Sequence, residues 1–274
     1  MIKHYTVSPT LDERDALIRL KDKRLFLFDL DGTLLKGKEK PIKLGGTIVF
    51  KRIRSEGKKL LVLTNNSTDT VAAVVRRLRS IGITVSSEEV LTSTRLTAEY
   101  IARRYGKASF FLVGESGFAE ELRMAGLRRT RGSTADVVAV GLDRRLSYDE
   151  LDKAVRLARG GAHIVACHSA PLYMFRRGPA VGVGPILKAI EYGSGKRGVP
   201  VGKPSPLMFE LAMKQAGCTA EETIMVGDQE DTDVEGASKV GVDSVLVLSG
   251  IYDGSSKTKA IGVIKNVDDL AQFI

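Results

Sequence analysis

Two carboxylates stand one residue apart directly after a short apolar run. Leu25–Phe28 is followed by Asp29, Leu30, Asp31 and Gly32. In an extended or turning segment, residues i and i+2 project to the same side, so both carboxylates can serve one site. One can act as an ionised nucleophile and the other as a protonated general acid, which is chemistry suited to phosphoryl transfer. An ordinary Asp-Gly turn explains the same residues about equally well.

A second polar cluster, Thr64-Asn65-Asn66, also follows an apolar run and precedes a helical pattern. A hydroxyl and exposed backbone N–H groups at such a place can hold phosphate oxygens. The simpler interpretation is a helix cap formed by Ser67 or Thr68, and both interpretations can hold together.

Two more segments could supply charge to the same chemistry. Lys203 lies in a loop with prolines at 204 and 206, which suits a fixed countercharge to phosphate, although a solvated loop lysine is the commoner interpretation. The segment 227–233 carries four acids in six residues, without His or Cys. Oxygen ligands of this kind suit Mg²⁺. A solvated acidic loop is the alternative, but its charges would repel one another without a cation.

The elements that must position these residues alternate along the chain. Apolar runs predict strands at 25–28, 59–63, 110–113, 136–140, 164–166, 223–226 and 244–248. Helical periodicity predicts helices at 71–81, 94–105, 118–125, 148–159 and 206–216. The short segment 193–195 reads as a loop. This alternation predicts an α/β fold with a doubly wound, Rossmann-like parallel sheet, in which ligands bind at the carboxyl ends of the strands.

The composition is that of an ordinary globular protein. The chain has 274 residues, of which 43% are hydrophobic and 27% charged, enough for one large or two modest domains. No apolar run approaches the ~20 residues of a membrane span. The segment 1–5 has no apolar signal-peptide region, so we expect a cytoplasmic protein without a membrane partner. Cys167 and Cys218 lie far apart, which favours buried free thiols over a disulfide or zinc site.

The net charge of +9 raises the question of a nucleic-acid partner. The basic residues are scattered among acidic ones and form no long tail, so a solvated basic surface is the better interpretation. A positive field would still gather small anionic substrates. A non-catalytic basic binding protein is the alternative from a different functional class.

Taken in order, the polar clusters resemble the four motifs of the haloacid dehalogenase (HAD) superfamily. D-x-D-G-T matches Asp29 to Thr33, and a Ser or Thr after a strand matches Thr64. The motif lysine matches Lys203, and G-D-x-x-x-T-D matches 227–233. Each motif alone is modest, but four in order are a strong signal.

The spacing of the motifs selects a branch of that superfamily. Only 35 residues separate Asp29 from Thr64, which leaves no room for a domain, whereas 139 separate Thr64 from Lys203. The longer interval has room for an inserted α/β cap of about 100 residues. The arrangement resembles the class II cap branch of p-nitrophenyl phosphatase and phosphoglycolate phosphatase-like enzymes. We therefore expect a HAD core at 1–83 and 185–274 and a cap at 84–184.

The resemblance implies a Mg²⁺-dependent phosphatase acting on small phosphomonoesters. Asp29 would form an aspartyl-phosphate, and Asp31 would act as general acid and then as base. The implied metal ligands are Asp29, the Asp31 main-chain carbonyl and Asp228, with Asp233 orienting the metal shell. The transferring phosphoryl group would be held by Thr64, Asn65 and Lys203. The substrate-binding residues expected are Gly32, Asn65, Asn66 and His168.

One departure from the branch concerns the cap. The chain reads Ala166-Cys167-His168-Ser169 where the branch usually carries a Thr-Asn-x-Asp-like segment, so the substrate stays open. His168 could contact substrate or titrate near neutral pH, or it could be a structural histidine. Related caps often pair, so a homodimer through the cap is a further expectation. A phosphotransferase or mutase is the enzymatic alternative, although mutases usually carry their cap between the first two motifs.

Overall fold

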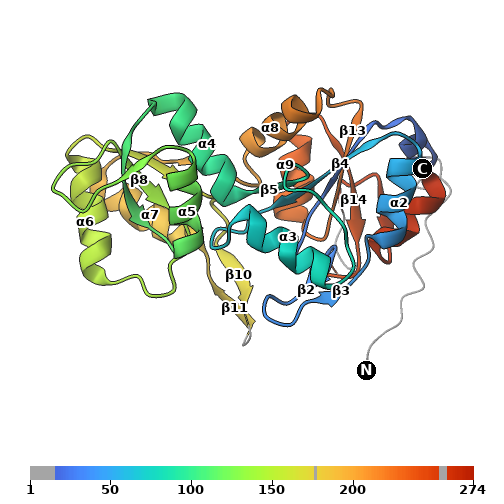
Figure 1. Ribbon diagram of the computed structural model, residues 1–274, viewed down its shortest axis with the longest axis horizontal. Helices are drawn as coiled ribbons and strands as arrows, with labels where there is room; N and C mark the ends of the chain where they lie inside the picture. The colour runs from blue at the N-terminus through green and yellow to red at the C-terminus, as the bar shows by residue number, and fades with distance from the viewer. Residues whose placement is uncertain (1–15, 176–177, 253–257) are drawn as a thin grey trace. The chain divides into compact units, whose positions relative to one another are not determined.

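The computed structural model describes residues 16–175, 178–252 and 258–274, and these form two compact units (Figure 1). The first unit comprises the described residues up to 63, residues 75–90 and those from 209 onward. The second comprises 64–74 and 91–208. The predicted core and cap boundaries stay a prediction; segment 64–74 and residues 185–208 group here with the second unit. The segment 1–5, on which the cytoplasmic expectation drew, lies outside the described residues.

A six-stranded sheet, ordered β15-β14-β13-β1-β4-β5, is the framework of the first unit. Its strands are β1 (Leu25–Phe28), β4 (Lys59–Thr64), β5 (Val90–Thr92), β13 (Thr223–Gly227), β14 (Asp243–Val247) and β15 (Gly262–Ile264). The pairs β1–β13, β1–β4, β13–β14 and β14–β15 are parallel. All four residues of β1 are buried, as expected of a central strand covered on both faces.

The register places the polar clusters at one edge of this sheet. Phe28 pairs with Val226 of β13 and with Val62 of β4, and the Asp29 N–H donates to the Val226 carbonyl at 2.9 Å. Asp29 therefore follows β1 at the carboxyl edge, where β13 also ends, and Thr64 is the last residue of β4. The predicted α/β class with a parallel sheet is confirmed.

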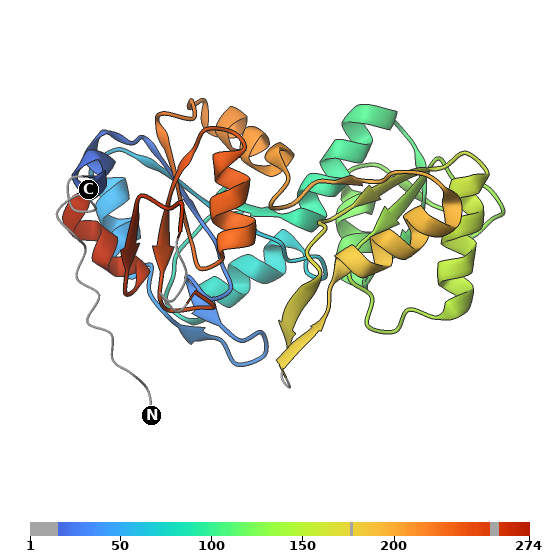
Figure 2. The same cartoon turned by 180° about the vertical axis from the view of Figure 1, so that it is seen from behind.

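Helices flank the sheet, and the view from behind shows α9 in front of it (Figure 2). The helices of this unit are η1 (Arg19–Asp22), α2 (Thr47–Ser55), the π-turn η2 (Glu230–Val234), α9 (Glu235–Ser238) and η3 (Val267–Phe273), and a short hairpin joins β2 (Leu35–Lys36) to β3 (Ile42–Lys43). Helices α3 (Val71–Ser80) and α8 (Pro206–Ala216) belong to this unit except for their first residues, which group with the second unit. Helix α2 was not predicted, because Gly46 at its N-cap offers no side-chain acceptor. Its acceptor is distant in sequence: Asp268 Oδ1 receives the N–H groups of Gly46, Ile48 and Val49, each at 3.0 Å.

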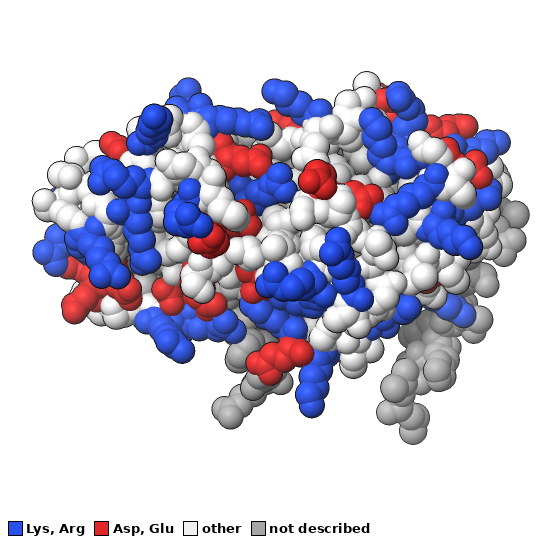
Figure 3. Space-filling view, viewed as in Figure 1, with Lys and Arg blue, Asp and Glu red and all other residues white. Residues whose placement is uncertain are grey.

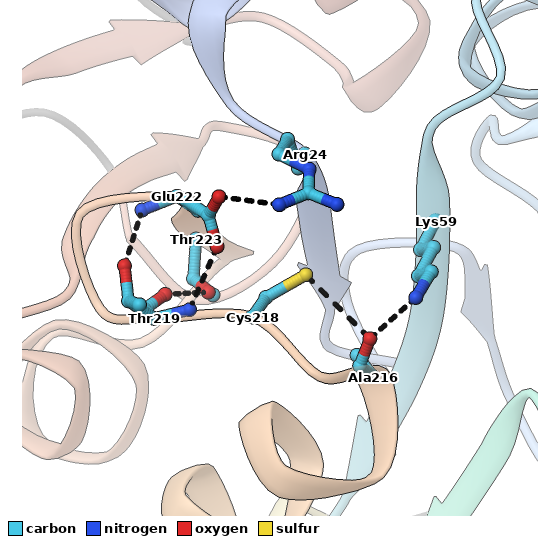
Figure 4. Close-up of polar contacts among 7 residues, drawn as sticks. All are labelled: Arg24, Lys59, Ala216, Cys218, Thr219, Glu222 and Thr223. Carbon is cyan, nitrogen blue, oxygen red and sulfur yellow. Dashed lines mark hydrogen bonds and ion pairs between the residues drawn. The ribbon is translucent and has the colours of Figure 1, made fainter.

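The opposite, amino edge of the sheet is tied to the loop after α8 (Figure 4). Arg24, next to β1, pairs with Glu222, and Lys59 at the start of β4 donates to the Ala216 carbonyl. Glu222 also accepts from the Thr219 N–H at 3.0 Å. Cys218 of this loop is partly exposed, so the expectation of a buried thiol is wrong for this residue.

The second unit is built on a five-stranded parallel sheet, ordered β12-β9-β8-β6-β7. Its strands are β6 (Ser109–Val113), β7 (Arg128–Arg129), β8 (Val137–Val140), β9 (His163–Ala166) and β12 (Val199–Pro200). Its helices are α4 (Ser93–Tyr105), α5 (Ser116–Met124), α6 (Tyr148–Arg159) and α7 (Val183–Ser194), and a hairpin joins β10 (Leu172–Phe175) to β11 (Gly178–Val181). One apolar core joins β6, β8 and β9 to α6 and α7.

Helix α7 was missed, and the segment expected to be a loop proves to be its carboxyl end. Gly193 and Ser194 are helical, and Gly195 follows as a left-handed C-cap with φ 72°. The N-cap, Gly182, has no side chain to cap the helix, so the sequence carries no start signal.

Basic and acidic side chains are interleaved on the face shown in Figure 3, in keeping with scattered charge. In the part of the chain that the structure describes, none of the helices has the length and apolar character needed to cross a bilayer.

Candidate functional site

Three buried carboxylates meet at the carboxyl edge of the first unit's sheet. Asp29 follows β1, Asp228 follows β13, and Asp233 lies in η2. Their exposed fractions are 6%, 0% and 1%, and one carboxylate oxygen from each lies within 4.8 Å of the others. Three negative charges that are this close together and this deeply buried would repel one another strongly. A cation bound among the three carboxylates would offset this repulsion.

Asp228 is held by the backbone of a loop after β14. The Ile251 N–H donates to Asp228 Oδ2 at 2.8 Å, and the Tyr252 N–H donates to the Asp228 carbonyl at 3.0 Å. A Cβ placed on Gly250 would lie 2.0 Å from Asp228 Oδ2, so this position accepts only glycine. The backbone of the loop after β14 thus holds the Asp228 carboxylate in place.

Asp233 is fixed in a comparable way by the turn that contains it. The Gln229 N–H donates to Asp233 Oδ2 at 3.1 Å, and the Asp233 N–H returns a bond to the Gln229 carbonyl at 3.0 Å. A Cβ on Gly227 would lie 2.2 Å from Asp233 Oδ2. Single turns of π-helix occur often at functional sites, and this one aims a carboxylate at its neighbours.

Asp31 differs from Asp29 because its side chain is exposed. The chain turns sharply after it: Gly32 has φ 98°, and its N–H donates to the Leu35 carbonyl at 2.8 Å. A Cβ on Gly32 would come within 2.2 Å of Asp228 Oδ2. The turn therefore needs glycine both for its backbone angle and for its contact with the acid cluster.

Two further residues of the predicted site, Asn65 and Lys203, lie together in the second unit. The Asn65 side-chain amide donates to the Lys203 carbonyl at 2.8 Å, which ties the segment after β4 to the Lys203 loop. Lys203 is 1% exposed, so it is a buried cation and not the solvated lysine that its loop sequence first suggested. The Asn65 Oδ1 is buried and has no hydrogen-bond partner among the described residues.

Thr64 and Asn66 organise the loop that follows β4. Thr64 Oγ1 accepts from the Asn66 N–H at 3.1 Å, and Asn66 Oδ1 accepts from the N–H groups of Thr68 and Asp69. The Asn66 side chain is therefore occupied within the loop, and its contact with substrate stays a prediction. The hydroxyl that caps α3 belongs to Thr70, which accepts from the Ala73 N–H, and not to Ser67 or Thr68.

His168 lies beside Lys203 and is 5% exposed. Burial, with a smaller contribution from the charge of Lys203, lowers the pKa of His168 to about 4. This environment favours the structural histidine among the interpretations left open by the sequence, and contact of His168 with substrate stays a prediction. Nδ1 accepts from the Ala170 N–H at 3.2 Å, which leaves the proton of the neutral ring on Nε2. The neighbouring Cys167 is fully buried, and burial raises the pKa of its thiol to about 12, so this cysteine is an inert thiol.

The three-carboxylate cluster fits a hard divalent cation. All its side-chain donors are oxygens, which Mg²⁺ prefers. The exposed Asp31 carboxylate is outside the cluster. That Asp31 offers its main-chain carbonyl to the metal stays a prediction.

The loop of Ser249, Gly250 and Ile251 was not singled out from the sequence. Ser249 Oγ donates to the Gly32 carbonyl at 2.8 Å, so this loop holds both Asp228 and the turn after Asp31. Its only signal was Ser-Gly after an apolar run, which is common to many loops. The sequence could not distinguish it because it acts through its backbone.

Comparison with known proteins agrees with this geometry. A haloacid dehalogenase-like hydrolase family model matches residues 26–128, and a HAD-hydrolase-like family model matches residues 200–272. The 5'-nucleotidase YutF of Bacillus subtilis is 32% identical over 85% of this chain and 90% of its own. The sugar-phosphatase AraL of the same organism is 33% identical over 82% of each chain.

Solved structures of similar proteins share the whole fold. A p-nitrophenyl phosphatase from Archaeoglobus fulgidus superposes with a TM-score of 0.83 and 31% identity, over 92% of this chain and 100% of its own. A 4-nitrophenylphosphatase from Thermotoga maritima gives 0.85 and 31%, over 92% and 98%. Together with the family models, these similarities show that the chain belongs to the haloacid dehalogenase-like hydrolase family and is an enzyme of its phosphatase branch.

Proposed function

We propose that the protein is a Mg²⁺-dependent phosphatase that hydrolyses small phosphomonoesters through an aspartyl-phosphate on Asp29. The observation that carries the proposal is the cluster of Asp29, Asp228 and Asp233, three buried carboxylates whose oxygens lie within 4.8 Å of one another. Mg²⁺ bound there by Asp29, the Asp31 carbonyl, Asp228 and Asp233 would offset their repulsion and neutralise phosphate charge.

In the first half of the reaction, the Asp29 carboxylate attacks phosphorus and the bond from phosphorus to the ester oxygen breaks. Asp31 gives its proton to the departing alcohol. In the second half, Asp31 takes a proton from water, the resulting hydroxide attacks phosphorus, and the bond to Asp29 breaks. The two aspartates suit different roles because Asp29 is buried at the end of β1, whereas Asp31 is exposed.

Lys203, Thr64 and Asn65 are assigned to the phosphoryl group. A buried ammonium favours an anion beside it, and the Asn65–Lys203 hydrogen bond fixes the loop that carries this charge. Phosphoryl transfer depends mainly on such positioning and electrostatic stabilisation. Contacts of Gly32, Asn66 and His168 with substrate stay predictions, as does a homodimer through the cap.

The substrate class is drawn from the relatives, whose names include sugar phosphatases, a 5'-nucleotidase and p-nitrophenyl phosphatases. The test is phosphate release from sugar phosphates, nucleoside monophosphates and p-nitrophenyl phosphate, with Mg²⁺ and with EDTA. Asp29→Asn serves as the blank, and Asp231→Asn, an exposed acid of the same loop as Asp228, is the matched control.

We expect Mg²⁺-dependent release by the wild type and by Asp231→Asn, and none by a folded Asp29→Asn. Turnover by Asp29→Asn at the wild-type rate would contradict the proposal. Transfer of phosphate to an acceptor alcohol without release of free phosphate would instead identify a phosphotransferase.

A further inference from the structure

Two adjoining, open surface cavities of about 340 and 400 Å³ lie in the second unit and are lined by none of the residues of the acid cluster. They share Tyr105, Gly161 and His163 in their walls. His163 begins β9, whereas His168 follows the carboxyl end of that strand, so the cavities lie at the opposite edge of the sheet from His168. Their volumes fall within the range of small-molecule sites.

The shared wall is an aromatic pair. The rings of Tyr105, the last residue of α4, and His163 stack with centroids 4.5 Å apart and an interplanar angle of 24°. Tyr105 is half-buried and His163 exposed, so the pair is fixed yet accessible. Flat, stacked side chains of this kind recognise a flat ring.

One cavity carries two neighbouring cations, Lys196 and Arg197. Throughout the described chain, neither side chain forms a hydrogen bond or ion pair, whereas nearby Lys188 is paired with Glu191 at 2.7 Å. Their loop is nonetheless fixed. The Lys196 N–H donates to Ser194 Oγ at 3.3 Å, and the Gly198 N–H donates to Glu191 Oε1 at 2.8 Å.

Stabilisation of the carboxyl end of α7 is the competing explanation for these cations. The carbonyl groups at that end already have hydrogen-bond donors. The Gly195 N–H donates to the Glu191 carbonyl at 2.9 Å, and Ser194 Oγ donates to the Ile190 carbonyl at 2.7 Å. The charge of Arg197 also acts on Glu191, but neither Lys196 nor Arg197 makes a side-chain hydrogen bond or ion pair within the described chain. Two such cations on a fixed loop beside one cavity suit an anionic ligand with more than one charge.

The other cavity offers an acceptor, Asp136. Its Oδ2 accepts from the N–H and hydroxyl of Ser109, both at 2.7 Å, and these bonds lower the pKa of the carboxyl. Asp136 is therefore an anion at neutral pH, and its Oδ1 is available to accept from a hydroxyl or amino group. Carboxylates recognise ribose hydroxyls in this way.

A flat ring, neighbouring negative charges and a hydroxyl donor occur together in a nucleotide. We infer that this edge of the second unit binds a nucleoside diphosphate, with its phosphates at Lys196 and Arg197, its base against Tyr105 and His163, and its ribose at Asp136. This site shares no residue with the proposed phosphatase site and would be occupied without hydrolysis.

Calorimetric titration of the full chain with α,β-methylene-ADP tests the inference, because this probe contains no phosphomonoester to hydrolyse. We expect saturable binding of one equivalent. Lys196→Ala/Arg197→Ala should weaken it at least about tenfold, as expected for the loss of charged hydrogen bonds. Tyr105→Leu should weaken it about fivefold through lost stacking. Arg123→Ala, an exposed cation of α5 that lines neither cavity, should bind like the wild type.

The Lys196→Ala/Arg197→Ala protein should keep wild-type turnover of p-nitrophenyl phosphate, which also shows that it is folded. Absence of saturation below about 5 mM would overturn the inference. So would equal weakening by Arg123→Ala, which would indicate only the general field of a basic protein. Pyrophosphate binding as tightly as the nucleotide would remove the role of the aromatic pair and overturn the nucleoside assignment.

Discussion

Asp29 and Asp31 are two residues apart, yet they occupy different surroundings. Asp29 is 6% exposed and belongs to the acid cluster, whereas Asp31 is exposed and lies where the chain turns at Gly32. A cation bound in the cluster would favour the ionised form of Asp29, which its proposed role as nucleophile needs. The role proposed for Asp31, proton exchange with a leaving group or with water, suits an exposed carboxyl outside the cluster.

Replacement of Asp31 tests the role assigned to it. Asp31→Asn cannot donate a proton to the departing alcohol, and this loss matters most when the alcohol is a poor leaving group. We expect kcat to fall about 10²–10⁴-fold with an alkyl phosphate and much less with p-nitrophenyl phosphate. Steady-state kinetics over phosphates of graded leaving-group pKa measure this, and an equal loss on every substrate would contradict the acid role.

His168 should affect stability at acid pH, because its pKa is lowered to about 4 in the folded chain from an ordinary value of 6.5. The unfolded chain binds this proton more tightly than the folded chain does, so protonation of His168 favours unfolding. Above pH 6.5 the ring is neutral in both states, and the free energy of unfolding carries no such penalty. As the pH falls from 6.5 toward 4, the free energy of unfolding decreases by up to about 3 kcal/mol. Urea unfolding at pH 7 and pH 4.5 should show a larger loss for the wild type than for His168→Gln.

An equal loss of stability in the two proteins would show that His168 is not a buried neutral ring. The same pKa predicts that His168→Gln leaves the shape of the pH–rate profile above pH 6 unchanged. A profile inflection near neutral pH that disappears in this variant would contradict the account.

At the scale of elements, α2 depends on a residue more than two hundred positions away. Asp268 Oδ1 caps its start through three N–H groups, and the negative charge also favours that helix end. Asp268→Ala should cost about 1–2 kcal/mol of unfolding free energy, as for other lost caps. Asp268→Asn keeps the acceptor oxygen and should cost less.

Denaturant unfolding of the two Asp268 variants measures this difference. Glu56→Ala, which removes an exposed partner of Arg52 on the same helix, is the control and should change stability by less than about 0.5 kcal/mol. The capping account is contradicted if Asp268→Ala matches that control.

The elements that the sequence revealed are those with local signals. Helix α6 was predicted at its observed bounds from its helical periodicity, and the structure adds a capping box of Ser147 and Glu150 at its start. Helices α2 and α7 were missed because glycines occupy their N-caps. Likewise, four motifs marked the acid cluster and Lys203, but the backbone bonds of Ile251 and the low pKa of His168 depend on contacts between distant segments.

At the scale of the molecule, the chain divides the proposed chemistry between two compact units. The first holds Asp29, Asp228 and Asp233 together, and the second ties Asn65 to Lys203. The long interval between Thr64 and Lys203 predicted a large insertion, and most of the second unit falls within that interval. The bounds of the units depend on packing and could not be read from spacing alone.

The central claim is that phosphate passes through Asp29. Wild-type enzyme mixed with Mg²⁺ and substrate, quenched during turnover, reduced with borohydride and digested should yield the peptide of Phe28 to Thr33 with Asp29 converted to homoserine. Substrate-free enzyme should yield no such peptide. A reduced carboxylate at any other position, or continued turnover with no reduced aspartate, would contradict the account.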